Sequence, residues 1–310
     1  MAKTPMHPDM QFLIKARDKA GAPVSTVADY RRFWNAYADA TATPPPASME
    51  IHDRAIHQGG HAVPVRVYRP KGPSGARACV IYLHGGGFML GDLDSSNTTA
   101  WGLAEGTGAV VVSVDYRLAP EHPFPAAFED SWDVLRWVAR HGSEIGVDPR
   151  RIAVAGDSAG GNLSAVLALA ARDQGGPALR AQAVVYPWVG LPFTYPSYQE
   201  NAEGPGLTLE SMHKFRKAYL GAEDTGDARA MPINAKSFAG LPPALVHTAE
   251  LDPIRDDGRV YAARLAEAGS WVTYREARGM IHGFLRARLA GAGATAEFKV
   301  VTDFLKEHLV

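Results

Sequence analysis

The chain has 310 residues, 46 % of them hydrophobic and 21 % charged, proportions that fit a soluble globular protein and exclude a wholly disordered or fibrous one. Its 32 Lys and Arg balance 33 Asp and Glu, and a net charge of −1 gives no reason to expect nucleic acid or an anionic membrane as a partner. The single cysteine, Cys79, can form neither an intramolecular disulfide nor a thiolate zinc site. With no secretory leader or membrane-spanning run apparent, we expect a cytoplasmic protein.

The first 48 residues predict a helical segment that is set apart from the rest of the chain. Apolar and aromatic residues recur there at spacings of three and four, before a Pro44-Pro45-Pro46 break. They are Val27, Tyr30, Phe33, Trp34 and Tyr37. Such a helix has one apolar face, which either packs on the core or covers a site.

Residues 49–53 and 63–69 alternate in the manner of strands, and Gly59-Gly60 indicates a turn between them. We expect this pair to form the antiparallel edge of a sheet. From residue 78 onward, short apolar runs alternate with helical stretches, which is typical of parallel strands covered by helices on both faces. The predicted strands are 79–83, 109–114, 152–155, 183–186, 244–248 and 271–274, and the predicted helices are 96–106, 127–141, 159–172 and 255–268.

Residues 188–232 interrupt this alternation. The stretch is rich in Pro and Gly and contains one amphipathic helix over 209–220, with Leu209, Met212, Phe215 and Tyr219 on one side. Insertions of this length between core strands are often functional. The length of the chain therefore fits a core domain with an insertion better than a single uninterrupted domain.

The sharpest chemical signal is Gly156-Asp157-Ser158-Ala159-Gly160, a G-x-S-x-G motif between a predicted strand and a predicted helix. A tight strand-to-helix turn pushes the serine out of the sheet, and the flanking glycines let neighbouring backbone approach closely. We therefore predict that Ser158 is a nucleophile. The alternative is an ordinary glycine-rich turn.

A second motif, His84-Gly85-Gly86-Gly87-Phe88, follows the predicted strand 79–83. Acyl transfer passes through a tetrahedral oxyanion that needs preorganised N–H donors, and consecutive glycines can turn their amides toward it. We predict the amides of Gly85, Gly86 and Ala159 as these donors. We assign His84 a structural role in fixing the loop.

A serine nucleophile needs a histidine base and a carboxylate that orients the base. In this type of fold the chain order is nucleophile, acid, histidine. His282 lies in a loop just past the last predicted strand, whereas the other histidines that follow Ser158 lie on a helix, in a buried strand or near the carboxyl end. Asp252 follows the strand 244–248 at the sheet edge where functional groups gather.

Other acidic and histidine residues compete with this assignment. Glu250 is the fallback acid, and Asp256 and Asp257 are interpreted as solvated charges in the first turn of a helix. His52, His57 and His61 could suggest a metal, but their spacing fits no helix face, so we expect a wet surface loop and no metal. These assignments follow from position alone.

At this point the chain resembles the hormone-sensitive-lipase-like family of bacterial esterases, within the α/β-hydrolase superfamily, over most of residues 63–307. The resemblance rests on five ordered motifs at residues 84–88, 115–126, 156–162, 252–258 and 282–284. It implies an α/β-hydrolase fold, a mostly parallel central sheet flanked by helices with a helical cap. It further implies ester hydrolysis by Ser158, Asp252 and His282, without metal or organic cofactor.

The resemblance also implies a domain organisation. The cap would comprise residues 1–48 and the insertion 188–232, and the catalytic domain residues 49–187 and 233–310. Many members of the family dimerise through the last strand, here about residues 271–278, from Trp271 to Arg278. The segment 115–126 carries no chemistry that we can identify, and we interpret it as a scaffold under the oxyanion loop.

We therefore expect a serine carboxylesterase that acts on small uncharged esters of short to medium acyl chain. The aromatic and apolar cap residues Phe33, Trp34, Met212 and Phe215 are candidates for substrate contact, although cap packing explains them as well. An amidase, arylformamidase or lactonase would use the same triad. A receptor similar to this family but lacking the histidine is a different class, and the presence of His282 argues against it.

Overall fold

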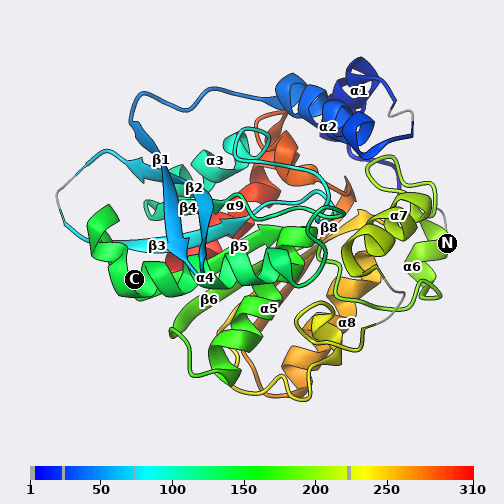
Figure 1. Ribbon diagram of the computed structural model, residues 1–310. Helices are drawn as coiled ribbons and strands as arrows, with labels where there is room; N and C mark the ends of the chain where they lie inside the picture. The colour runs from blue at the N-terminus through cyan, green and yellow to red at the C-terminus, as the bar shows by residue number, and fades with distance from the viewer. Residues whose placement is uncertain (1–3, 23–24, 73–74, 222–224) are drawn as a thin grey trace.

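The computed structural model describes residues 4–22, 25–72, 75–221 and 225–310. An eight-stranded sheet crosses the molecule in the order β1-β2-β4-β3-β5-β6-β7-β8 (Figure 1). The strands are β1 (Met49–Gln58), β2 (His61–Pro70), β3 (Arg77–Leu83), β4 (Val110–Val114), β5 (Val147–Asp157), β6 (Leu179–Val185), β7 (Ala244–Leu251) and β8 (Val272–Ile281). The β1–β2 and β2–β4 pairs are antiparallel and the other pairs are parallel. The mostly parallel architecture predicted from the sequence is confirmed.

Two groups of helices cover the two faces of the sheet. On one face lie α3 (Asn97–Thr107) and α9 (Ala292–His308), whose apolar residues share a buried cluster with the strands. On the other face lie α4 (Ala126–His141), α5 (Ala159–Asp173) and α8 (Arg255–Glu267), which share a second buried cluster. Burial on both faces explains why the central strands are continuous apolar runs rather than alternating ones.

The amino-terminal segment and the insertion contribute further helices, which lie on the same side of the molecule in Figure 1. They are α1 (Gln11–Ala20), α2 (Val27–Thr41), α6 (Pro196–Glu200) and α7 (Leu209–Leu220). A capping box between Thr26 and Asp29 starts α2. The predicted helices near residues 27–37 and over 209–220 are therefore confirmed, whereas the division into cap and catalytic domains stays a prediction.

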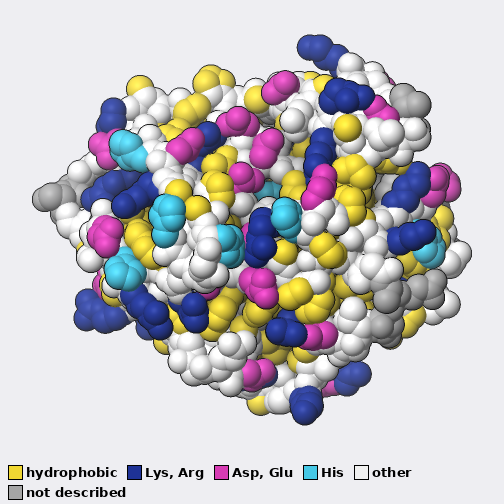
Figure 2. Space-filling model, viewed as in Figure 1, with side chains coloured by type: hydrophobic (Ala, Val, Ile, Leu, Met, Phe, Trp, Pro, Cys, Tyr) yellow, Lys and Arg dark blue, Asp and Glu magenta, His cyan; other side chains and the backbone are white. Residues whose placement is uncertain are grey.

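Short 3₁₀ helices connect these elements. They are η1 (Pro8–Met10), η2 (Gly142–Ile145), η3 (Pro232–Asn234) and η4 (Phe284–Ala287). In the described ranges, no helix has the length and apolarity needed to cross a membrane. On the face drawn in Figure 2, basic and acidic side chains are interspersed, as the near-zero net charge leads us to expect.

The two outermost strands are longer than their sequence patterns indicate. The strand predicted to end at residue 53 continues to Gln58, and the one predicted over 271–274 continues to Ile281. In both strands exposed residues interrupt the apolar pattern before buried residues resume it, at Ile56 in β1 and from Ala277 in β8, so the pattern covers only part of the paired backbone. The Gly59-Gly60 turn between β1 and β2 is confirmed, and both glycines have positive φ.

Candidate active site

Ser158 lies on the turn between β5 and α5, where the G-x-S-x-G motif places it. Its backbone has φ 58° and ψ −117°, a conformation that residues other than glycine rarely adopt. Such a conformation costs about 1–3 kcal/mol and persists only when its surroundings enforce it. Here the Ser158 amide donates to the Val185 carbonyl at 2.9 Å, and α5 begins at the next residue. The serine side chain is thereby held above the end of the central strand.

The glycines on either side of Ser158 are needed for close backbone contact. A Cβ on Gly156 would collide with the Gly160 carbonyl, and a Cβ on Gly160 would collide with the Leu83 carbonyl. The start of α5 therefore packs directly against the end of β3. This contact also sets the spacing between Ser158 and the glycine-rich loop that follows β3.

His282 and Asp252 complete an ordered array with Ser158. The His282 Nε2 atom lies 2.9 Å from Ser158 Oγ, and His282 Nδ1 lies 2.7 Å from Asp252 Oδ2. His282 follows the end of β8, and Asp252 follows the end of β7, so both come from the same sheet edge as Ser158. Asp252 is completely buried, and its Oδ1 accepts the Ile254 amide at 3.0 Å. Hydrogen bonds to both oxygens fix the carboxylate in place.

A tyrosine and a second carboxylate pack beneath this array. The Tyr186 ring lies 4.8 Å from the His282 ring, centroid to centroid, and its hydroxyl contacts Asp157 Oδ2 at 3.3 Å. The Tyr82 hydroxyl donates to Asp157 Oδ1 at 2.7 Å. Burial raises the pKa of both tyrosines well above the ordinary value, so their hydroxyls remain donors to Asp157. Asp157 lies within the G-x-S-x-G motif, but no role was assigned to it from the sequence, which did not indicate its contacts with Tyr82 and Tyr186.

The structure corrects one of the three predicted oxyanion donors. The Gly85 amide donates to Asp157 Oδ1 at 3.2 Å, and Gly85 does not line the cavity beside Ser158. Gly86, Gly87 and Ala159 do line that cavity. Among the described residues, the Gly86 and Gly87 amides have no acceptor, and the Ala159 amide is at the start of a helix, where no intrahelical acceptor exists. Gly87 therefore replaces Gly85 as a candidate donor.

His84 and the segment 115–126 support the glycine-rich loop. The His84 ring is buried, contacts the Gly85 carbonyl at 2.9 Å and stacks on Tyr116 with a centroid distance of 4.3 Å. Burial lowers the pKa of His84, which favours a neutral imidazole. The Ala119 amide donates to the Phe88 carbonyl at 2.8 Å. These contacts agree with the structural roles inferred for His84 and for this segment.

A cavity of about 250 Å³ opens above Ser158 and His282. All four predicted contact residues, Phe33, Trp34, Met212 and Phe215, line it. Other apolar residues of the wall were not predicted, because nothing in the sequence shows that their side chains face the cavity; they include Phe88, Leu90, Trp188 and Leu207. The cavity is therefore bounded by the amino-terminal segment, the insertion and the oxyanion loop together.

Polar residues of the two helical segments meet at the cavity. The Lys214 Nζ atom donates to the Tyr30 hydroxyl at 2.9 Å and pairs with Glu210 at 2.8 Å. All three residues line the cavity, and the contact joins α7 to α2.

The competing acids lie away from His282. Glu250 accepts the Thr4 hydroxyl at 2.6 Å and the Gly279 amide at 2.8 Å. Asp256 and Asp257 are 6 % and 0 % exposed, so the interpretation of both as solvated charges is wrong. Residues of the insertion cover the start of α8 and bond to both carboxylates. Burial raises the pKa of Asp257 to about 7.

The three amino-terminal histidines lie on β1 and β2 rather than in a loop. His52 and His57 are on β1, while His61 begins β2 and contacts the buried Asp130 at 2.5 Å. Within the described residues, no group of three or more His, Cys, Asp or Glu side chains is arranged as a metal site. Cys79 is buried in β3, and burial raises the pKa of its thiol well above the ordinary range.

Comparison with known proteins places this chain among carboxylesterases. Residues 80–286 match the family described as having the alpha/beta hydrolase fold. The chain is 42 % identical over 302 residues to the Carboxylesterase NlhH of Mycobacterium tuberculosis, covering 94 % of this chain and 95 % of that protein. It is 37 % identical to an ethyl acetate hydrolase of Pseudomonas putida, covering 81 % of this chain and 80 % of the relative.

A solved structure shares the whole architecture. The crystal structure of a thermostable esterase from Pseudomonas putida superposes with a TM-score of 0.93 at 35 % identity, covering 100 % of this chain and 99 % of that chain.

Proposed function

Since the chain belongs to the α/β-hydrolase family and is a carboxylesterase, we propose that Ser158, His282 and Asp252 hydrolyse its ester substrate in two steps through an acyl-enzyme. The observation that carries this proposal is the continuous array from Ser158 Oγ through His282 to Asp252, at 2.9 Å and 2.7 Å. A base within hydrogen-bond reach of a serine hydroxyl, and itself oriented by a carboxylate, is the arrangement that activates a serine nucleophile.

In the first step, His282 Nε2 takes the Ser158 hydroxyl proton while Ser158 Oγ bonds to the ester carbonyl carbon. The carbonyl oxygen becomes an oxyanion, and the amides of Gly86, Gly87 and Ala159 stabilise its charge. The intermediate collapses as the C–O bond of the alcohol breaks and His282 gives its proton to the leaving oxygen. Ser158 is then acylated.

In the second step, His282 Nε2 takes a proton from water as the water oxygen attacks the acyl carbon. The second oxyanion is held by the same amides, and its collapse returns the proton to Ser158 Oγ and releases the carboxylic acid. Throughout, Asp252 holds the Nδ1 proton of His282 and stabilises the imidazolium. No step requires a metal or organic cofactor.

Replacing Ser158 tests this assignment directly. Ser158→Ala removes the atom that forms the acyl bond, so turnover of a p-nitrophenyl short-chain ester should fall by about 10⁶-fold, to the residual rate supplied by the oxyanion donors and binding alone. The variant should fold normally, because alanine at position 158 keeps the backbone hydrogen bond to the Val185 carbonyl. Turnover close to that of the wild type would overturn the assignment.

For the substrate, we propose small uncharged esters with short to medium acyl chains. The cavity is only about 250 Å³, and Phe33, Trp34 and Phe215 bound it. The relative from Pseudomonas putida named as an ethyl acetate hydrolase supports the same size class. A series of p-nitrophenyl esters from two to sixteen acyl carbons should give its highest kcat/KM at the short end, and an optimum at sixteen would refute this range.

Amides and lactones are alternative substrates, because the same triad and oxyanion donors can hydrolyse an ester, an amide or a lactone bond. A p-nitroanilide matched in acyl chain to the best ester separates the amide alternative, and we expect the ester to be turned over faster. A non-catalytic receptor is disfavoured by the position of His282 within 2.9 Å of Ser158.

Self-association is a separate proposal. β8 is one of the two outermost strands, and Trp271, which precedes it, is 69 % exposed. Two copies could therefore pair along the region from Trp271 to Arg278. Light scattering coupled to gel filtration should give a dimer mass that Trp271→Glu lowers, and a monomer mass for the unaltered protein would contradict this proposal.

A further inference from the structure

The turn that carries Asp252 is held by its own neighbours and also by the insertion. Within the turn, the Ile254 amide donates to Asp252 Oδ1 at 3.0 Å and the Arg255 amide to the Asp252 carbonyl at 3.2 Å. Asp252 and Pro253 join β7 to α8, which begins at Arg255. The residue before α8, Ile254, has no side-chain acceptor for the free amides of the first turn, and no capping bond is formed by it. The free backbone amides at a buried helix start therefore need a hydrogen-bond acceptor from another part of the chain.

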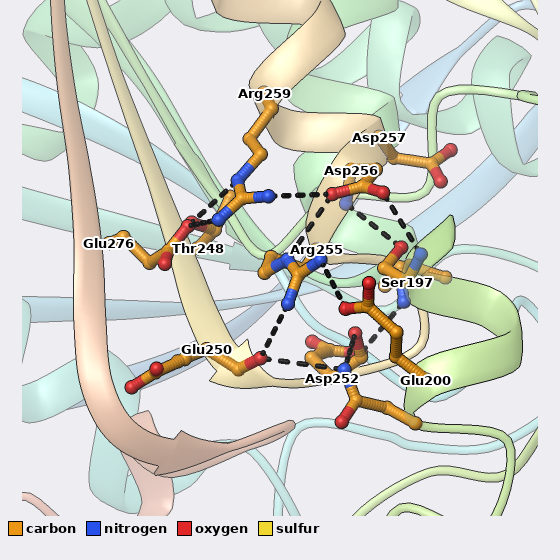
Figure 3. A network of polar contacts seen from close by, with 12 residues as sticks. Ser197, Glu200, Thr248, Glu250, Asp252, Arg255, Asp256, Asp257, Arg259 and Glu276 are labelled. Atoms are coloured by element: carbon orange, nitrogen blue, oxygen red, sulfur yellow. Dashed lines mark hydrogen bonds and ion pairs between the residues drawn. The ribbon is translucent and has the colours of Figure 1, made fainter. Parts of the chain in front are cut away.

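Ser197 of α6 supplies this partner. Its hydroxyl accepts the Asp256 amide at 3.1 Å and donates to the Pro253 carbonyl at 2.7 Å. Its own amide donates to Asp256 Oδ2 at 2.9 Å. Figure 3 shows Ser197 facing the start of α8 from the opposite element. Ser197 thus caps α8 and holds the residue next to Asp252 at the same time.

Asn201, four positions further along the insertion, holds Asp252 itself. Its side-chain amide donates to the Asp252 carbonyl at 3.2 Å. Between Ser197 and Asn201, Glu200 pairs with Arg255 Nη2 at 2.7 Å, and Arg255 Nε contacts Asp256 Oδ1 at 3.2 Å (Figure 3). Three polar residues in or directly after α6, namely Ser197, Glu200 and Asn201, therefore contact residues 252–256.

These contacts are buried, which makes them hard to replace. Ser197 is 0 % and Asn201 is 5 % exposed. Removing the Ser197 hydroxyl would leave the Asp256 amide and the Pro253 carbonyl without a partner, and the turn would shift to recover one. Removing the Asn201 side-chain amide would leave the Asp252 carbonyl with the Arg255 amide, at 3.2 Å, as its remaining donor. The Asp252 carboxylate has little room for a shift, because its two oxygens serve the Ile254 amide and His282. Catalytic groups tolerate only about 0.5 Å of displacement.

We propose that Ser197 and Asn201 are positioning residues for ester hydrolysis, which act by clamping the turn that carries Asp252. This proposal rests on the role of Asp252 in the proposed function. The insertion would then both position Asp252 and line the cavity, because the same segment carries Met212 and Phe215 on the cavity wall. The part of the chain that contacts the substrate then also places the acid of the triad.

Ser197→Ala is the first test. We expect kcat for a p-nitrophenyl ester to fall by about tenfold, while KM stays within about twofold, because the change misplaces Asp252 without touching the cavity. The matched control is Ser131→Ala. Ser131 is also completely buried and its hydroxyl also donates to a carbonyl at 2.7 Å, but it lies within α4, away from the site. It should leave kcat unchanged.

Two further variants test whether the loss of kcat comes from the Ser197 hydroxyl itself. Tyr198→Phe removes another buried contact of α6, the 2.7 Å bond to Asp257 Oδ2, and should lower kcat less than Ser197→Ala does. Ser197→Thr retains the hydroxyl and should restore most of the lost kcat. If Ser197→Ala does not fold, Asn201→Ala carries the same prediction, since it removes the bond to the Asp252 carbonyl without altering α8.

The decisive measurement is a double-mutant cycle. If Ser197 acts through Asp252, then Ser197→Ala should change kcat by less than about twofold in an Asp252→Asn background, against about tenfold in the unaltered enzyme. An equal fall in both backgrounds, no fall in either, or the same fall for Ser131→Ala would overturn the proposal. An Asp252→Asn enzyme with full kcat would instead contradict the proposed triad, so the two failures are distinguishable.

Discussion

The two ends of the catalytic array are supported in different ways. At the Ser158 end, the support is backbone: a strained turn, glycines that admit neighbouring carbonyls, and amides left free at a helix start. At the Asp252 end, the support is side chains of the insertion, which lie 51 to 59 positions away in the chain. The nucleophile is therefore positioned by backbone contacts with the core strands, at Val185 and Leu83, whereas the acid also depends on side chains of the insertion, which shapes the cavity as well.

The largest expected effect on kcat comes from replacing Asp252, the acid of the triad. Asp252→Asn leaves the shape of the turn nearly intact but favours the wrong tautomer of His282 and removes the charge that stabilises its imidazolium. We expect kcat for a short-chain p-nitrophenyl ester to fall by about 10⁴-fold with little change in KM. The control is Glu250→Gln, because Glu250 contacts Thr4 and Gly279 rather than His282. A comparable loss for Glu250→Gln would reverse the choice of acid.

The next effect tests the backbone support at the serine end. Gly160→Ala places a Cβ against the Leu83 carbonyl, so we expect it to lower the free energy of unfolding by about 3 kcal/mol. Gly108→Ala is the comparison, since its Cβ would meet open space and only its φ of 70° is unfavourable, at about 1 kcal/mol. Urea unfolding of the two variants measures the difference. Equal losses would show that close packing at Gly160 is unimportant.

The smallest effect concerns Asp257, which ties the beginning of the insertion to α8 through the Val189 amide and the Tyr198 hydroxyl. Burial raises its pKa in the folded protein to about 7, from an ordinary value of 3.8. Between these values the folded state keeps a proton that the unfolded state has lost. The stability contributed by this group is therefore present at low pH and is lost as pH rises toward 7, by at most about 1.4 kcal/mol per pH unit.

Asp257→Asn removes this titration, because an amide does not ionise. The unfolding free energy of the variant should therefore rise relative to that of the unaltered protein as pH goes from 5 to 7. Urea unfolding at several pH values measures the difference between the two proteins, in which the other titrating groups cancel. A difference that stays constant over this range would mean that Asp257 is ionised throughout.

The same contrast explains what could be predicted from sequence. The Ser158 turn, the positions of His282 and Asp252, and the helix at 209–220 were all predicted from short patterns that can be recognised within a few residues. Gly85 was misassigned because the sequence does not reveal that Asp157, distant in the chain, accepts its amide. Asp256 and Asp257 were misread for the same reason, since only the fold places the insertion over them.

The lengths of the two outermost strands were underestimated for a different reason. In β1 and β8, exposed residues such as Arg54 and Arg275 interrupt the hydrophobic pattern, while pairing with β2 and β7 continues past them to buried residues such as Ile56 and Ile281. A pattern of buried residues can locate a strand but cannot show how far an exposed edge strand continues. α9 was not predicted at all, although it covers one face of the sheet.

Covalent labelling with a fluorophosphonate, followed by mass spectrometry, tests the central claim that Ser158 is the activated nucleophile. We predict one adduct per chain, located on the peptide that contains Ser158, with ester hydrolysis lost in proportion to labelling. The reaction should be much slower in Asp252→Asn, because the base is then misoriented. An adduct on another residue, or hydrolysis that survives complete labelling of Ser158, would contradict the account.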